Sequence, residues 1–306
     1  MRNMRNILCI TILVGIYLTS CTPPGEKFLQ SGVIKSEKGD FAGAIKDYTE
    51  AIKLDSFLVE AYNNRGNAYI QLGKFKEAIR DYNTAIDIEP EHASAYFNRG
   101  IAWNEYGDPN RAIYDYTKAI ELEPGNARAY YNRGNCKSNL KKYKDAVTDY
   151  NKAIELSPDY ADAYYNRGLT RCNLEDYKTA LGDFDNAVKI NPKFTEAFSN
   201  RAAAKYRLGD FPGSIADYSK VIELDPKNTT AFKNRGVAKS KIKDYPGAIA
   251  DFNQALSLNP KDGIAYNNRG TAKHETGDLK GACQDWEKAA SLGFPNAKEN
   301  IRKYCK

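Results

Sequence analysis

One three-residue string returns at a fixed interval through most of this chain. It is Asn-Arg-Gly, once Asn-Arg-Ala, and consecutive copies lie 34 residues apart; its arginines are Arg65, Arg99, Arg133, Arg167, Arg201, Arg235 and Arg269. A constant interval over so long a stretch indicates one supersecondary unit repeated in tandem, with each copy packed against its neighbours. The length of 306 residues therefore reflects the number of repeats and not the number of globular domains.

The unit from residue 59 to residue 92 has the pattern of two helices. Its first half carries apolar residues on one helical stripe, namely Tyr62, Tyr69 and Leu72. After Gly73 a second stripe runs through Ala78, Ile79, Tyr82, Ala85 and Ile86. Pro90 cannot continue a helix and marks the end of the second one.

This unit resembles the tetratricopeptide repeat (TPR), a helix-turn-helix unit of 34 residues. The matching residues are Tyr62, Gly66, Tyr69, Ala78, Tyr82, Ala85 and Pro90, at repeat positions 4, 8, 11, 20, 24, 27 and 32. The resemblance covers residues 25–296 as eight units that start at residues 25, 59, 93, 127, 161, 195, 229 and 263. It implies an all-α fold, a right-handed α-solenoid of about eight repeats. We expect residues 297–306 to form a polar capping helix.

The first 20 residues differ in kind from the repeats. Arg2 and Arg5 precede an apolar run from Ile7 to Leu18, and the segment contains no acidic residue. This is the pattern of a signal peptide. The run is shorter than the roughly 20 apolar residues that a membrane-spanning helix needs, so cleavage is favoured over a permanent span.

The end of that segment resembles the lipobox of bacterial lipoproteins. The residues are Leu18-Thr19-Ser20-Cys21, and the resemblance implies a mature chain that begins at a lipidated Cys21. Residues 21–24 would then be a lipidated linker before the first repeat. The alternative is that Cys21 is an ordinary small core residue. No basic tract accompanies the net charge of +6, so we expect no nucleic-acid partner.

Small residues recur at two positions of the unit. A glycine inside a helix costs up to about 1 kcal/mol relative to alanine, so its return at position 8 needs a compensating contact. We expect the glycines to face the alanines of position 20 and to let the paired helices touch. The glycines are Gly32, Gly66, Gly100, Gly134, Gly168, Gly236 and Gly270; the alanines are Ala44, Ala78, Ala112, Ala146, Ala180, Ala248 and Ala282.

Position 23 is aspartate in every unit, and position 7 is arginine in seven of them. If each aspartate paired within its own unit, Asp47 would face Ser31 and be left alone. Pairing with the following unit gives every aspartate a partner, including Asp285 with Lys303, so we expect inter-repeat pairs with a structural role. They are Asp47–Arg65, Asp81–Arg99, Asp115–Arg133, Asp149–Arg167, Asp183–Arg201, Asp217–Arg235 and Asp251–Arg269.

The sequence offers no catalytic or metal centre. His92 and His274 are its two histidines, and neither has cysteine or carboxylate neighbours at a metal-ligand spacing. We therefore expect no enzyme, no metal and no cofactor. Among the cysteines, Cys283 and Cys305 could form a disulfide in an exported chain, since the capping helix should dock on the helix that carries Cys283. The sequence does not decide whether this disulfide forms.

The family resemblance implies a concave groove lined by first helices, with positions 2, 5, 9, 12 and 13 exposed to a protein partner. Position 5 carries Phe97, Tyr131 and Tyr165 in consecutive units, a candidate row of aromatic anchors. Position 6 carries asparagines able to hold a peptide backbone, including Asn98, Asn132 and Asn166. The alternative is that the position 5 rings shield neighbouring helices. The pattern of the carboxylate-clamp subgroup is missing.

These observations favour a non-catalytic scaffold that binds extended or helical segments of partner proteins. The lipobox places it on a bacterial membrane, with the outer membrane favoured, facing the periplasm or the cell surface. The rival hypothesis is a glycan- or peptidoglycan-binding lipoprotein in which Phe97, Tyr131 and Tyr165 stack on sugar rings.

Overall fold

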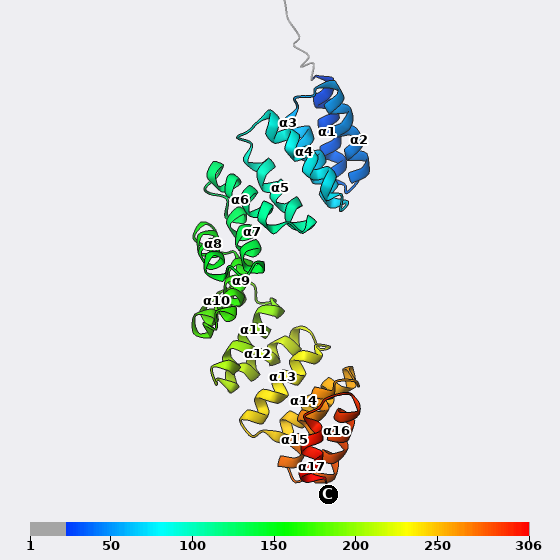
Figure 1. Ribbon diagram of the computed structural model, residues 1–306, viewed down its shortest axis with the longest axis vertical. Helices are drawn as coiled ribbons and strands as arrows, with labels where there is room; N and C mark the ends of the chain where they lie inside the picture. Colours follow the sequence, from blue (N-terminus) through cyan, green and yellow to red (C-terminus); the bar gives the residue numbers. More distant parts are fainter. Residues whose placement is uncertain (1–22, 306) are drawn as a thin grey trace, which may run out of the picture. The chain divides into compact units, whose positions relative to one another are not determined.

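The computed structural model describes residues 23–305, which form 17 helices and no strand (Figure 1). The expected signal peptide and the lipidation site Cys21 lie outside these residues. The first helices of the eight repeats are α1 (Pro24–Glu37), α3 (Val59–Gln71), α5 (Ala93–Tyr106), α7 (Ala127–Asn139), α9 (Ala161–Asn173), α11 (Thr195–Arg207), α13 (Thr229–Lys241) and α15 (Gly263–Glu275). The second helices are α2 (Phe41–Leu54), α4 (Phe75–Ile88), α6 (Pro109–Leu122), α8 (Tyr143–Leu156), α10 (Tyr177–Ile190), α12 (Phe211–Leu224), α14 (Tyr245–Leu258) and α16 (Leu279–Ser291). The last helix is α17 (Ala297–Tyr304).

The architecture is an all-α helical-repeat solenoid, as the sequence predicts. It comprises two compact units, one that ends at Tyr106 and one that begins at Gly107. Inside each unit, the second helix of a repeat packs against the first helix of that repeat where both lie in the unit, and against the first helix of the next repeat, or against α17 at the C-terminal end. In the described part of the chain no helix is both long and apolar enough to cross a bilayer.

The turn between the two helices of a repeat depends on position 15, which needs a left-handed backbone. Glycine supplies it in five repeats, with φ between 69° and 94°, at Gly39, Gly73, Gly107, Gly209 and Gly277. Lys141, Glu175 and Lys243 adopt the same conformation at the equivalent position of three other repeats. Next to many of these turns an aspartate caps the second helix; Asp40 Oδ1, for example, accepts a hydrogen bond from the Gly43 amide at 2.8 Å.

In repeats 1, 2, 4, 5, 7 and 8 the core contains an aromatic ring laid against a glycine, whereas repeat 6 has Ala202 in place of the glycine. The ring is at position 24 and the glycine at position 8; a Cβ on Gly168 would lie 2.8 Å from Phe184 Cε1, and one on Gly66 would lie 2.6 Å from Tyr82 Cε1. The expectation that position 8 faces the alanines of position 20 is confirmed at Gly236 and Gly270, where a Cβ would lie 3.2 Å from the Ala248 carbonyl oxygen and 3.1 Å from that of Ala282. Those alanines are fully buried, and the atoms nearest to the missing Cβ belong to the position 24 ring.

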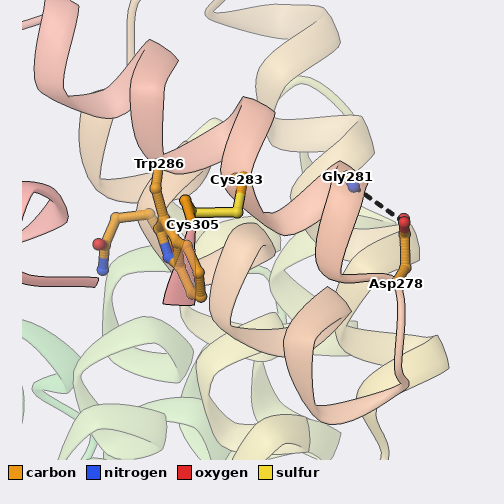
Figure 2. The surroundings of a disulfide bond; sticks show 6 residues. Asp278, Gly281, Cys283, Trp286 and Cys305 are labelled. Carbon is orange, nitrogen blue, oxygen red and sulfur yellow. Dashed lines mark hydrogen bonds between the residues drawn. A yellow bond between two sulfur atoms is a disulfide. The ribbon is translucent and has the colours of Figure 1, made fainter. Parts of the chain in front are cut away.

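The C-terminal helix covers the end of the array. Ala297, Ile301 and Tyr304 of α17 pack against Trp286 of α16. The Cys283 and Cys305 sulfurs join the two helices through a disulfide, with the Cα atoms 5.7 Å apart (Figure 2). The His274 ring lies 4.3 Å from the Tyr304 ring, centroid to centroid, so this histidine serves packing.

Two glycines of one repeat allow a matched test of the core. Gly168→Ala forces the Phe184 ring to move and should lower the free energy of unfolding by about 1–2 kcal/mol, the typical cost of overpacking less the gain in helix propensity. Gly182 lies in α10 with nothing within 4 Å of its Cβ direction. Gly182→Ala should therefore raise the unfolding free energy by up to about 1 kcal/mol. Urea unfolding measures both, and shifts in the same direction would contradict this account.

Candidate functional site

The constant spacing of arginine and aspartate reflects pairs inside the repeat in repeats 2 and 4–8. Asp149 accepts hydrogen bonds from Arg133 of its own repeat, at 2.7 Å from Nη2 and 3.0 Å from Nε. Arg167, the partner expected from the sequence, instead binds Asp183. The other observed pairs are Arg65–Asp81, Arg201–Asp217, Arg235–Asp251 and Arg269–Asp285.

The expected inter-repeat pairs are therefore wrong: Asp47–Arg65, Asp81–Arg99, Asp115–Arg133, Asp149–Arg167, Asp183–Arg201, Asp217–Arg235, Asp251–Arg269 and Asp285–Lys303. The expectation assumed that Asp47 would be unpaired inside its own repeat, but position 11, one helical turn after position 7, supplies a further donor. In repeat 1, Asp47 accepts from Ser31 Oγ at 2.6 Å and from Lys35 Nζ at 2.6 Å, so it is not left alone. Asp285 likewise receives Lys273 Nζ at 2.9 Å in addition to Arg269.

The same arginines do join neighbouring repeats, but through a different residue. Their remaining Nη1 donates to position 25 of the preceding repeat; Arg65 reaches Thr49 Oγ1 at 3.0 Å, and Arg133 reaches Thr117 Oγ1 at 3.0 Å. The equivalent acceptors of later repeats include Asn151, Asp185, Ser219 and Asn253. Each guanidinium also lies over the ring at position 4, as Arg167 does over Tyr164 at 5.4 Å. Their role is structural.

The acidity of the position 23 aspartate differs between repeats 1 and 2. In Asp47 burial raises the pKa, but the hydrogen bonds from Lys35 and Ser31 outweigh it, and the pKa falls below its ordinary value. In Asp81 burial also raises the pKa, and Arg65 offsets it only in part, so the pKa stays raised. Position 11 of that repeat is Tyr69 rather than a lysine.

A lysine at position 69 tests this reading. In repeat 4 the position 11 residue Lys137 places Nζ 2.8 Å from Asp149, so Tyr69→Lys should lower the pKa of Asp81 toward or below its ordinary value. Because a raised folded-state pKa stabilises the fold at low pH and loses that effect as the pH rises through it, the variant should also weaken this acid-side stabilisation. Carboxyl NMR titration measures the pKa.

The matched control adds the same charge elsewhere on α3. Gln71 is exposed on the same helix, so Gln71→Lys should leave the pKa of Asp81 nearly unchanged because solvent screens a surface charge. Equal effects of the two lysines would show that the pKa of Asp81 responds to the overall electrostatic field and not to a direct contact with the lysine.

The three residues of the candidate aromatic row differ in exposure. Phe97 is only 8% exposed and belongs to the core, so the expectation of a partly exposed anchor is wrong for this residue. Tyr131 and Tyr165 are half-buried. Their rings lie 4.7 Å from those of Tyr160 and Phe194, the last residues before the next repeats. These two rings fill the space between repeats.

The position 6 asparagines near these rings are engaged with neighbouring repeats. Asn166 Nδ2 donates to the Tyr131 hydroxyl at 2.9 Å and to Asn135 Oδ1 at 3.0 Å. Asn98 Nδ2 donates to Asn63 Oδ1 at 3.0 Å. Asn132, on α7, is half-buried. In Asn98 and Asn166 the amide donors that could hold a peptide backbone thus already bind neighbouring repeats.

An open groove lies further along the array, over the first helices of repeats 6, 7 and 8. It consists of two adjoining hollows of about 290 Å³ and 400 Å³ that share Tyr206 and Val237. The first is completed by Ala203, Arg207, Tyr218 and Asn234, and the second by Ser240, Lys241, Tyr245, Phe252, Asn268, Thr271 and Glu275. Most of these residues occupy positions 6, 9, 12 and 13 of α11, α13 and α15.

The groove opens where position 5 loses its aromatic ring. After Tyr165 that position carries Ser199, Lys233 and Asn267, and Lys233 is drawn to Asp262 at 2.7 Å. Position 9 in turn holds the small Ala203, which lacks the amide that binds the position 24 hydroxyl in earlier repeats. The change from aromatic to small or polar residues at position 5 is the sequence signal that would have located this groove.

Polar groups in the groove remain loosely engaged. Asn234 has a hydrogen bond of 3.3 Å to the Tyr218 hydroxyl, and Asn268 accepts one of 3.4 Å from Asn267. Arg207 and Lys241 line it against a single carboxylate, Glu275. Within residues 23–305 no cluster of three histidine, cysteine or acidic side chains could hold a metal ion. The groove can therefore offer tyrosine faces, amides and cations to a bound chain.

Comparison with known families agrees with the repeat length. A model described as TPR repeat matches residues 32–73, 66–103 and 204–242. A second model, described as tetratricopeptide repeat, matches residues 93–126, 127–160, 161–194 and 230–262. Together the matches span well over half of the chain. No curated protein matches it.

Several solved structures share this architecture. YrrB, described as a TPR protein with an unusual peptide-binding site, is 28% identical; the alignment covers 60% of this chain and 95% of YrrB, with a TM-score of 0.56. MamA is 28% identical over 56% of this chain and 93% of its own, with a TM-score of 0.52. The C-terminal part of a TPR protein from Cytophaga hutchinsonii has a TM-score of 0.68 at 18% identity, over 78% of this chain and 98% of its own, which shows the fold.

Proposed function

Because this chain belongs to the tetratricopeptide repeat family of protein interaction scaffolds, we propose that it is a non-catalytic adaptor that binds an extended peptide segment of a partner protein. The groove over α11, α13 and α15 carries this proposal. Its two adjoining hollows suit consecutive side chains of an extended segment, and peptide binding in the related YrrB supports the same use here.

The lining indicates what the segment should contain. Arg207 and Lys241 outnumber Glu275, so an acidic side chain on the segment would be attracted to the groove. Asn234 and Asn268 can bind the peptide backbone through their amides. Tyr206 and Tyr245 supply rings for apolar side chains.

We further propose that the adaptor is a lipoprotein of a bacterial envelope, tethered through Cys21 to the outer membrane and facing the periplasm or the cell surface. The support is the n-region, the short apolar run and the lipobox of the sequence. Two or more acyl chains give stable anchoring, so the groove would act on partners at the membrane surface.

Blocking the groove should abolish peptide binding. Val237 lines both hollows, and Val237→Arg would place a long cation in the middle of the path. A photo-reactive residue at Tyr206 should crosslink to one segment of one protein in the native membrane. That segment, made as a synthetic peptide, should bind the parent chain and bind Val237→Arg at least about tenfold more weakly, because a buried contact is lost and a side chain intrudes.

The control variant is Gln254→Arg, which adds the same cation at an exposed position of α14. Its peptide affinity, measured by fluorescence anisotropy, should equal that of the parent. Equal affinities of all three proteins would rule out this groove as the binding site.

The tether is tested separately. Cys21→Ala should either leave the membrane for the aqueous phase or retain residues 1–20, because no acyl chain can be attached without the thiol. Cys172→Ala, which removes a thiol on α9, should partition into detergent like the parent. A Cys21→Ala protein that loses its signal peptide and still partitions into detergent would disprove the lipid anchor.

A further inference from the structure

An unusual phenylalanine is exposed near the N-terminal end of the array. Phe57 lies in the loop between α2 and α3 with 75% of its side chain exposed. In the next six repeats this loop position, position 33, carries Glu91, Gly125, Asp159, Lys193, Lys227 and Lys261, all of them exposed. A position that faces water in every repeat is thus occupied by a large apolar ring in the first repeat alone among these seven.

The loop holds that ring in place. The Phe57 amide donates to Asp55 Oδ1 at 2.9 Å, which forms a turn. Leu54, just before the turn, is 54% exposed, whereas its equivalents Leu122, Leu156, Ile190 and Leu258 are 36–40% exposed. Phe57 and Leu54 therefore form an apolar edge on a fixed backbone, and no partner within repeat 1 covers it.

This edge lies where the chain approaches Cys21. Pro23 and Pro24 line a hollow of about 310 Å³ together with Leu54 and Leu58. Gly25 is buried against the end of α2, where a Cβ would lie 3.4 Å from the Ala51 carbonyl oxygen. Cys21 is two residues before Pro23, and two residues span at most about 7 Å. A lipid on Cys21 would therefore bring the bilayer surface next to Leu54 and Phe57.

From this placement we propose that Phe57 and Leu54 insert into the bilayer interface as a second membrane contact beside the acyl chains. The inference rests on the proposed tether at Cys21. Phenylalanine and leucine are among the residues that membrane-surface helices bury at the boundary between headgroups and acyl chains, and the tether makes a weak contact effective because it keeps the local lipid concentration high. Lys53 is paired with Glu50 at 2.6 Å, and Lys27 follows Glu26 directly in the sequence, so insertion should not require anionic lipid.

A tryptophan at position 57 reports the contact. The full lipoprotein carrying Phe57→Trp is reconstituted into phosphatidylcholine vesicles, with and without phosphatidylglycerol, and the emission of the parent, from Trp103 and Trp286, is subtracted. We expect blue-shifted emission and at least about twofold quenching by phosphatidylcholine with brominated acyl chains, because the ring lies among those chains. Both lipid compositions should give the same result.

The matched control is Lys193→Trp, at position 33 of repeat 5. Its emission should be that of an exposed indole and should not respond to brominated lipid. Equal quenching at both positions, or an unquenched Phe57→Trp, would overturn the proposal. A blue shift that appears without vesicles and grows with protein concentration would show that a second copy covers the edge, and would overturn it as well.

The mass of the same sample separates the two claims. A chain that begins at Cys21 and carries acyl chains establishes the tether, so an unquenched tryptophan then defeats the membrane contact alone. A mass without lipid defeats the tether and, with it, this inference, while the peptide-binding groove is unaffected.

Discussion

The close contact between the position 8 glycine and the position 24 ring limits the distance between the paired helices in repeats 1, 2, 4, 5, 7 and 8. With a Cβ at Gly66 or Gly168, Tyr82 or Phe184 would have to withdraw, and the two helices would separate. The arginine at position 7 reaches the aspartate at position 23 across this gap, and Arg201 reaches Asp217 in the same way in repeat 6, where Ala202 replaces the glycine. The same guanidinium then extends to the preceding repeat, so the geometry of one pair is passed to the next.

Buried charge is tolerated in this array because it is shared. Asp149, which is 2% exposed, receives Arg133 and Lys137, and the arginine in turn has an acceptor in the preceding repeat and a ring beneath it. A buried charge with several partners at short distance avoids most of the desolvation penalty of an isolated one. A single substitution in such a network affects two repeats at once.

The fold could be predicted from the sequence because the 34-residue period, with glycine, alanine and proline at fixed positions in it, is typical of one structure, a tandem array of paired helices. The partners of the aspartates could not be deduced by elimination. Elimination leaves Asp47 unpaired only when position 7 alone is considered; Lys35 lies one turn further on the same helix and reaches this carboxylate. Assigning one arginine to each aspartate does not take this second donor into account.

The candidate site shows a related error. Phe97 is conspicuous in the sequence because it is large, but it lies in the core, since a large ring in a closely packed array can fill space rather than leave it open. The groove instead lies where small and polar residues, such as Ser199 and Ala203, follow the aromatic ones. The packing of neighbouring rings decides which repeats leave room for a groove. The spacing of residues in the sequence does not describe that packing.

The disulfide at the end of the array bears on the order in which repeats would unfold. In a linear array each repeat is stabilised by its neighbours, so the terminal repeats, with one neighbour each, are the first to open. Cys283 and Cys305 are 22 residues apart in sequence, and a cross-link of that length contributes about 3 kcal/mol by restricting the open chain. Fraying from the C-terminal end is thereby suppressed under oxidising conditions. Loss of structure would then progress from the other end, and a reducing environment would restore both directions.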